Sequence, residues 1–362
     1  MSRQPDGGTA GRSAADGVDW EGALRLARVA TPAGPQVPGA ARRGVVALLR
    51  RSADDAIPWA ARITGLSRAA REAADTTRVL VVDRVGVQRA NAAFLRTLMG
   101  RVPDPDAQHG LLAPASRRLV SGAVAGLLGL VSARVLGQVL PAGDGAPGSR
   151  MLLVAPNVLE LQRSRDLDRL DLPAWVTLHE AAHVLQLAAA PWLTGHLAAQ
   201  VGEVATALMR TPGAGEPRGL TRLARVLRAD ASARPGEPSA LLTDRLGAAE
   251  RERLAAVAAT MALLEGHAEA VLDAVEPSHM PSVHRLRAVL GHSHESAAGT
   301  LLERVLGVEA KQMQYADGAA FVRGVVGRVG HAGLNVVWQA PANLPRPEEI
   351  VRPAAWIERM GL

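Results

Sequence analysis

The sequence contains one short motif whose residue types and spacing could activate water at a metal ion. His179, Glu180 and His183 form the pattern His-Glu-x-x-His. On a helix, residues four positions apart lie on one face, so the two imidazoles can each give a ring nitrogen to one tetrahedral ion. The carboxylate of Glu180 lies beside them and can accept a proton from water. The motif therefore predicts a zinc site with two histidine ligands and a glutamate that acts as general base.

A third protein ligand is needed, because a catalytic zinc ion usually has three protein ligands and an open position for water. A pattern that continues with Gly and His is excluded, since the chain has Gln186 and Ala189 at those positions. We favour Glu265, which lies in a mostly apolar helical segment four residues before Glu269. Glu265 could bind the metal while Glu269 accepts the free ring N–H of a ligand histidine. The alternatives for the third ligand are His267, Glu203 and His196.

Other polar side chains could assist the chemistry or bind metal adventitiously. Hydrolysis of an amide produces a tetrahedral oxyanion, which a tyrosine or histidine donor would stabilise. Our catalytic candidate for this role is Tyr315, the only tyrosine, with His331 as the alternative, and a structural role stays open for both. A further cluster near two prolines is expected to be an exposed loop; it contains His279, His284, His292 and His294.

Helices must position these residues, and the sequence predicts where they lie. Asp171 can cap a helix and Pro173 suits its first turn, so the motif is predicted to lie in a helix over 171–187. Periodic apolar residues predict other helical segments. These are 20–29, 39–66 with an interruption at Pro58, 248–275 and 301–326.

Two runs have the composition of β-strands, 78–83 and 151–155, and they could pair in one small sheet. The fold is therefore predicted to be mainly α with a small β-sheet, with its core built around the His-Glu-x-x-His helix. Residues 1–17 lack an apolar run and are predicted to form a disordered tail. The remainder, 18–362, is predicted to be a single domain.

The composition excludes several classes of protein and of site. The 48% hydrophobic content excludes global disorder. The chain has no cysteine, which excludes disulfides and cysteine-bound zinc, so metal ligands must be histidines and carboxylates. Lysine and arginine number 41 against 35 acidic residues, a net charge of +6. This basic balance alone would suggest nucleic acid, but acids lie among the arginines and only 2% of residues are aromatic, which disfavours that partner.

Membrane and targeting signals are also weak. The longest apolar run, 119–133, is shorter than the roughly twenty residues that a spanning helix needs. We interpret it as a buried helix whose glycines allow close contact. The first residues do not resemble a secretory signal, so we predict a cytoplasmic protein with no membrane span. The oligomeric state is left open.

Several motifs, taken in chain order, resemble one family. They are Leu80-Val81-Val82-Asp83, Arg89-Ala90-Asn91, Leu152-Leu153-Val154-Ala155-Pro156-Asn157, Leu178-His179-Glu180-Ala181-Ala182-His183, Pro191-Trp192-Leu193, Leu264-Glu265-Gly266-His267-Ala268-Glu269, Gln314-Tyr315-Ala316-Asp317-Gly318 and Phe321-Val322-Arg323. In this order the chain resembles the actinobacterial zincin-like metallopeptidase family, a group of uncharacterised hydrolases. One branch of that family is associated with biosynthesis of the deazaflavin coenzyme.

The resemblance covers about 18–350 and implies a zincin-like core. It also implies zinc at His179 and His183, with Glu180 catalytic, and it implies little about the substrate. The chain departs from the family pattern at Val139 and Leu140, where relatives have an aromatic residue and an acid. This departure affects the surface there and not the metal.

Two classes of function fit these observations best. The first is a zinc-dependent hydrolase of peptide or other amide bonds, in which Glu180 is the base for a metal-activated water. The second is a noncatalytic interaction protein with a structural or decayed zinc site. The glutamate favours the enzyme, because a purely structural site needs no base. An arginine-rich nucleic-acid binder is a third, weaker reading.

Overall fold

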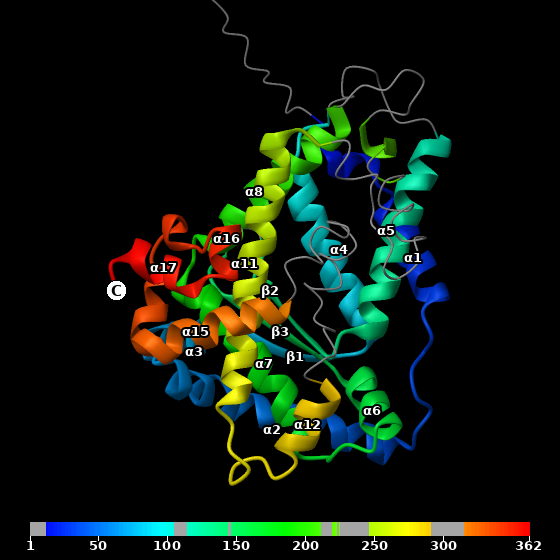
Figure 1. Ribbon diagram of the computed structural model, residues 1–362. Coiled ribbons are helices and arrows are strands. Elements are labelled where there is room, and N and C mark those ends of the chain that lie inside the picture. Colours follow the sequence, from blue (N-terminus) through cyan, green and yellow to red (C-terminus); the bar gives the residue numbers. More distant parts are fainter. Residues whose placement is uncertain are drawn as a thin grey trace, which may run out of the picture.

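Helices dominate the computed structural model, which describes most of the chain (Figure 1). The described residues are 12–104, 114–143, 146–210, 219–222, 224, 246–290 and 315–362. The helices of the first half are α1 (Trp20–Ala30), α2 (Gly39–Thr64), α3 (Ser67–Thr76), α4 (Arg84–Gly100), α5 (Pro114–Arg134) and α6 (Ala155–Ser164). Those of the second half are α7 (Asp171–Ala189), α8 (Leu193–Arg210), α11 (Ala248–Asp273), α12 (Val283–Leu290), α15 (Tyr315–Leu334), α16 (Pro347–Ile350) and α17 (Pro353–Met360). The prediction of a mainly α fold with a small sheet is confirmed.

Three strands of the described chain form one sheet in the order β1-β3-β2. The central strand β3 (Ser149–Val154) pairs in parallel with β1 (Thr77–Val82). On its other side it pairs antiparallel with β2 (Gly137–Pro141), with Gly137 opposite Leu153. The two strands predicted from sequence therefore share one sheet, as expected. β2 was missed because a short edge strand bounded by glycine and proline has little strand signature.

Helices cover both faces of this sheet. On one face, Met151 and Leu153 pack in a core with α7 and α2. On the other face, Val154 packs with Val87 of α4 and Val131 of α5. The C-terminal helices lie on the left of Figure 1, against α11, whereas α1, α4 and α5 lie on the right. The sheet is thus a middle layer that supports α7 from one side.

The helix α7 begins at Asp171, but its cap differs from the prediction. Asp168 Oδ1 accepts hydrogen bonds from the backbone N–H groups of Leu170 and Asp171, at 2.8 and 2.9 Å. It thereby satisfies two of the donors that a helix leaves free at its N-terminus. The Asp171 carboxylate instead accepts from the backbone of Ser282, at 2.7 Å. The prediction that Asp171 caps this helix is wrong.

The helix α2 is continuous, so the predicted interruption at Pro58 is also wrong. A proline inside a helix removes one backbone hydrogen bond and costs about 3 kcal/mol. Here α2 buries a stripe of Leu49, Ala53, Ala56 and Ala60 in the same core as α7. This spacing of three and four residues keeps one face of the helix in contact with the core, and the packing offsets the loss at the proline.

Residues 12–17, which the sequence analysis assigned to a disordered tail, have a described structure. Residues Ala14–Gly17 form the 3-10 helix η1. The backbone N–H of Ala14 donates to the carbonyl of Val102, and that of Asp104 donates to the carbonyl of Arg12. Residues 12–17 are therefore anchored to the end of α4, and residues 1–11 lie outside the described part of the chain.

Two apolar helices were compared with what a membrane-spanning helix requires. The run 119–133 lies in α5, as predicted, but no described atom lies within 4 Å of where a Cβ of Gly122 or Gly126 would be. The close contact is made instead at Gly129, whose Cβ would lie 3.3 Å from Thr31 Oγ1. Among the described helices α11 alone is long and apolar enough to span a membrane, and most of its apolar stretch is buried within the protein. Packing in the core accounts for that apolarity.

Candidate metal centre

The two histidines of the motif lie side by side on α7. Their Nε2 atoms are 3.2 Å apart and their rings meet edge to face. Each side chain is 16% exposed, so both rings are held largely by protein. The i and i+4 spacing places both nitrogens on the same helical face, as the sequence predicted.

α11 brings Glu265 to these two histidines. Its Oε2 lies 3.5 Å from His179 Nε2 and its Oε1 lies 3.7 Å from His183 Nε2. The three residues form a group whose donor atoms all lie within 4.8 Å of one another. Ligands bound to zinc at about 2.0–2.2 Å in tetrahedral geometry lie roughly 3.3–3.6 Å apart. The spacing and chemistry of this donor set therefore fit a zinc ion.

A close helix crossing fixes the position of Glu265. The next residue, Gly266, lies directly against the backbone of Gly318 on α15, and a Cβ at either glycine would overlap with the backbone of the facing helix. Only glycine permits this approach. The contact with α15 therefore fixes α11 in the position at which Glu265 faces the histidines of α7.

Glu180 lies next to this group without belonging to it. The carboxylate lies against Gly137 of β2. The two residues are so close that a Cβ atom at Gly137 would lie 2.5 Å from Glu180 Cγ and 2.6 Å from Oε1. Glu180 is 5% exposed, and no described residue donates a hydrogen bond to it. Burial, opposed by His179 and reinforced by the charge of Glu265, raises the pKa of Glu180 to about 7.

The two ligand histidines differ in their affinity for protons. Burial lowers the pKa of His179, but the hydrogen bond and negative charge of Glu265 outweigh it and raise that pKa to about 9. Burial also lowers the pKa of His183, and there it prevails over the attraction of Glu265. In the metal-free protein at neutral pH, one histidine is therefore charged and paired with Glu265 while the other is neutral.

All three alternative third ligands contact other residues. Glu203 forms an ion pair with Arg253 at 2.6 Å. His267 is fully buried, and its Nδ1 lies 3.0 Å from Gln186 Nε2. Burial, reinforced by His331 and His183, lowers the pKa of His267 to about 3. His196 packs edge to face on Trp192, at 5.8 Å between ring centres.

The structure limits the predicted role of Glu269 to one of the two histidines. Nδ1 of His183 lies 2.9 Å from Gln186 Oε1, so Gln186 and not Glu269 is the hydrogen-bond partner of this ring nitrogen. Its charge is among those that raise the pKa of His179, which places it near that residue. That Glu269 accepts the ring N–H of His179 stays a prediction.

The remaining candidates are only partly described. α15 begins at Tyr315, but the side chain of that residue lies outside the described part of the structure. His331 is half-buried, on the same helix. His279 is exposed and close to Trp59, whereas His292 and His294 lie outside the described residues. The predicted helix over 301–326 is described only from 315 onward, where it is α15.

Sequence reasoning missed two residues that touch the site, Gln186 and Gly137. Gln186 lies three residues after His183, one turn along the same helix face, and this spacing is the signal that could have found it. Gly137 had no such signal, because its contact with Glu180 depends on the unpredicted strand β2.

With this geometry established, comparison with known proteins is informative. A family model of zincin-like metallopeptidases matches residues 18–357. The chain belongs to this zincin-like metallopeptidase family. The match covers both the motif helix and α11, so the zincin-like core expected from the resemblance is confirmed. An actinobacterial branch and a link to deazaflavin biosynthesis stay predictions.

One solved structure similar to this zincin-like protein comes from Chloroflexus aurantiacus, where it is described as a "putative hydrolase with a novel fold". It is 24% identical, with a TM-score of 0.63, over 95% of this chain and 99% of that chain. At this identity the likeness shows a shared fold. No curated protein matches the chain.

Proposed function

We propose that this protein is a zinc-dependent hydrolase of peptide or other amide bonds, with Glu180 as the general base. The observation that carries the proposal is the position of Glu180, which is buried beside the three candidate ligands and outside them. A structural zinc site is usually closed by four protein ligands and needs no base. The described group has three ligands, which favours the hydrolase over the noncatalytic alternative.

Three residues of the chain would bind the metal ion, and a fourth would transfer the proton. His179, His183 and Glu265 would hold the ion, which when bound polarises the scissile carbonyl and lowers the pKa of water. Glu180 accepts a proton as the water's oxygen attacks the carbonyl carbon. It then gives this proton to the nitrogen that leaves when the C–N bond breaks. Burial raises the pKa of Glu180, so this carboxyl holds a proton more readily than an exposed glutamate does.

The position of β2 supports a peptide as substrate. β2 lies at the edge of the sheet, and it pairs with β3 alone among the described strands. An edge strand can accept an extended polypeptide through backbone hydrogen bonds on its unpaired side. Gly137 of this strand contacts Glu180, so a peptide paired along β2 would pass the general base. Tyr315 as the donor to the oxyanion stays part of this proposal.

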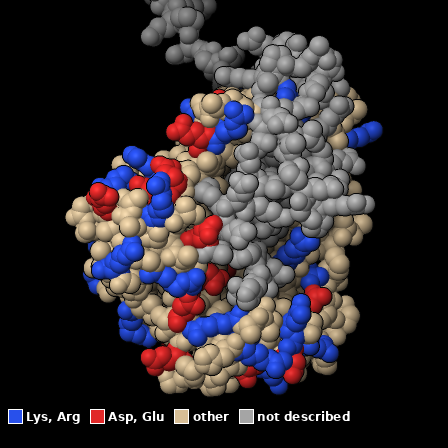
Figure 2. Space-filling view, in the orientation of Figure 1, with Lys and Arg blue, Asp and Glu red and all other residues tan. Residues whose placement is uncertain are grey.

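Several arginines of the described residues pair with acidic side chains. Figure 2 shows one face of the molecule, and over its described part acidic side chains lie among the arginines. Arg253 pairs with Glu203 and Arg323 pairs with Asp273, both at 2.6 Å, and Arg68 pairs with Glu72 at 3.0 Å. Such mixed pairs reduce the local positive potential that would attract a phosphate backbone.

The decisive experiment replaces the base without changing its shape. We expect Glu180→Gln to keep one zinc per chain, measured by elemental analysis, while cleavage of a peptide library followed by mass spectrometry falls about 100-fold or more. Glu203→Gln is the matched control, since it removes a carboxylate that pairs with Arg253 away from the ligands. Loss of zinc from Glu180→Gln would make Glu180 a ligand. A zinc-loaded wild type that cleaves nothing would favour the noncatalytic alternative.

A further inference from the structure

We propose that Gln186 and His267 hold His183 in the one tautomer and orientation that leave its Nε2 atom free for the metal. The inference rests on the proposed zinc site and adds two positioning residues to it. Both are buried: Gln186 is 1% exposed and His267 is not exposed at all. They come from the two helices that carry the ligands, α7 and α11.

A backbone carbonyl fixes the orientation of the Gln186 amide. The side-chain nitrogen of Gln186 lies 2.8 Å from the carbonyl oxygen of Leu264, which can only accept a hydrogen bond. With the amide turned over, its oxygen would lie 2.8 Å from the carbonyl oxygen of Leu264, and neither atom could donate a hydrogen bond. Its Oε1 must therefore face His183, whose Nδ1 lies 2.9 Å away. Because an amide oxygen only accepts, Nδ1 of His183 carries the hydrogen and Nε2 keeps its lone pair.

His267 takes the second hydrogen of the same amide. Its Nδ1 lies 3.0 Å from Gln186 Nε2, a nitrogen that has two N–H groups and no lone pair to offer. The Nδ1 of His267 must therefore accept, and its own ring hydrogen is on Nε2. The ring packs edge to face on Trp338, at 5.3 Å between centres, which holds it in this position. This also explains why a histidine two residues from Glu265 is not itself a ligand.

The Gln186 amide thus links the two halves of the site. It orients His183 on α7, and it binds the carbonyl of Leu264, the residue directly before Glu265 on α11. Removing it would release the ring of His183 and remove a buried hydrogen bond between the two ligand helices. Residues that support metal ligands in this way commonly change metal affinity by 10- to 100-fold when mutated.

The first test measures zinc affinity directly. We expect Gln186→Leu to weaken zinc binding by roughly 10- to 100-fold, measured by competition with a chelator of known affinity. Thr177→Val is the matched control, because it removes a buried hydrogen bond from the same helix, to the carbonyl of Pro173, without touching a ligand. It should bind zinc as tightly as the wild type. An affinity of Gln186→Leu within about twofold of the control would overturn the proposal.

The second test asks whether His267 acts through Gln186. We expect His267→Leu to weaken zinc binding, and His267→Asn to restore most of it, because the asparagine oxygen can occupy the place of Nδ1 and accept from Gln186. The double variant with Gln186→Leu should bind zinc no more weakly than Gln186→Leu alone. Additive losses, or no rescue by asparagine, would show that His267 does not act through Gln186.

A measurement on the wild type covers the case in which these variants do not fold. Long-range proton–nitrogen NMR of the metal-free protein distinguishes the two neutral histidine tautomers. We expect the hydrogen of His267 on Nε2 and that of His183 on Nδ1, and the opposite tautomer at either residue would overturn the assignment. Failure of the zinc site itself would have a different signature, since His179→Ala, His183→Ala and Glu265→Ala would then also leave zinc affinity unchanged.

Discussion

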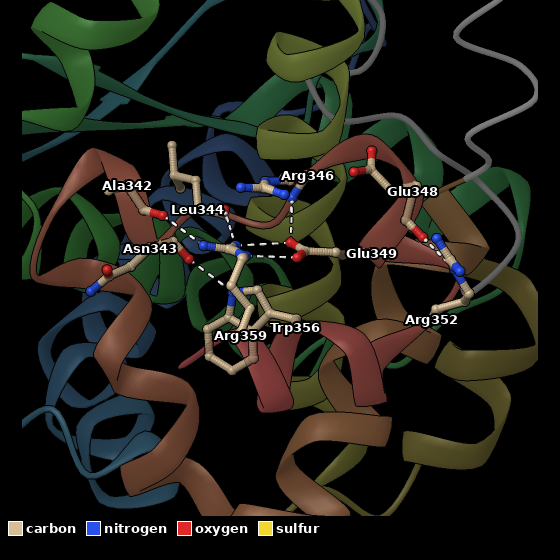
Figure 3. Close-up of polar contacts among 9 residues, drawn as sticks. All are labelled: Ala342, Asn343, Leu344, Arg346, Glu348, Glu349, Arg352, Trp356 and Arg359. Atoms are coloured by element: carbon tan, nitrogen blue, oxygen red, sulfur yellow. Dashed lines mark hydrogen bonds and ion pairs between the residues drawn. The ribbon is translucent and has the colours of Figure 1, made fainter. Parts of the chain in front are cut away.

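Glu180 at the metal centre and Glu349 in the C-terminal segment are equally removed from water, at 5% and 4% exposure, but they differ in their partners. Glu349 accepts hydrogen bonds from Arg359 Nε at 2.6 Å, from the terminal nitrogen of Arg359 at 2.8 Å and from the backbone of Arg346 at 2.8 Å (Figure 3). Glu180 has no such donor among the described residues. The two buried carboxyls therefore differ in their hydrogen-bond donors.

The pKa values of the two carboxyls move in opposite directions as a result. Burial raises the pKa of Glu180 to about 7. Burial acts in the same direction on Glu349, but Arg359 and the backbone of Arg346 outweigh it and hold its pKa below the ordinary value. Arg359 also donates to the carbonyls of Ala342 and Leu344, which ties α17 to the chain before α16. A fully paired buried carboxylate stabilises the fold, whereas one that lacks a donor keeps its affinity for a proton and can transfer it.

The largest expected difference between the two regions is in metal content. His179→Ala, His183→Ala and Glu265→Ala should each remove most of the bound zinc, because three protein ligands supply the affinity. Glu349→Gln should keep one zinc per chain, since Glu349 contacts arginines and not the ligands. Elemental analysis after purification without added metal checks both. Zinc retained by a double His179→Ala and His183→Ala variant would place the ligands elsewhere.

A smaller effect is expected where β2 touches the general base. Gly137→Ala would place a methyl group 2.5 Å from Glu180 Cγ, so the carboxylate or the strand must move. We expect peptide cleavage to fall at least tenfold while zinc content stays the same. Gly122→Ala is the control, because no described atom lies within 4 Å of its Cβ position. Unchanged cleavage by Gly137→Ala would mean that the position of Glu180 beside β2 does not matter.

The charged histidine of the metal-free site predicts a pH dependence of zinc binding. The pKa of His179 is raised to about 9, so at pH 7 zinc must displace a proton from it. We expect about one proton to be released per zinc bound at pH 7, and the apparent affinity to fall about tenfold for each pH unit below 9. Calorimetry in buffers of different ionisation enthalpy counts the protons. Binding without proton release would show that His179 is neutral before zinc binds.

The stability of the metal-free protein should respond to the two carboxylates with opposite sign. Glu349 has a lowered folded pKa, so it stabilises above its ordinary pKa of 4.5, and this contribution is lost as the pH falls through the folded value. Glu180 has a raised folded pKa, so it lowers stability progressively as the pH rises from 4.5 to about 7. At pH 8 we expect Glu349→Gln to lower the free energy of unfolding by about 2 kcal/mol. Glu180→Gln should raise it by an amount on the order of 2 kcal/mol.

Urea unfolding at pH 4 and pH 8 measures both changes. The two differences should shrink at pH 4, where the unfolded chain is largely protonated at both positions. Equal signs at pH 8 would contradict the comparison between the two carboxylates.

Local patterns in the sequence predicted those features that depend on near neighbours along the chain. The i, i+4 spacing of His179 and His183 places both on one helical face in any helix that contains them, and the structure has that helix. The apolar runs 78–83 and 151–155, which lie largely in β1 and β3, were also recognisable, because a short apolar run of strand length is itself a local signal. The errors at Asp171 and Pro58 arose where a neighbouring side chain or core packing outweighed a local preference.

Only the tertiary structure decided which distant groups meet the motif. Glu265 is 82 residues from His183 in sequence, and its carboxylate lies beside the two histidines only because α11 packs against α7 and, through Gly266 and Gly318, closely against α15. Gly137 faces Glu180 because the antiparallel pairing of β2 with β3 sets its register. Gln186 donates to Leu264 and His267 because α7 and α11 cross at that point. A helix fixes the spacing of its own residues, whereas contacts between elements depend on how whole faces pack, and no local pattern specifies that.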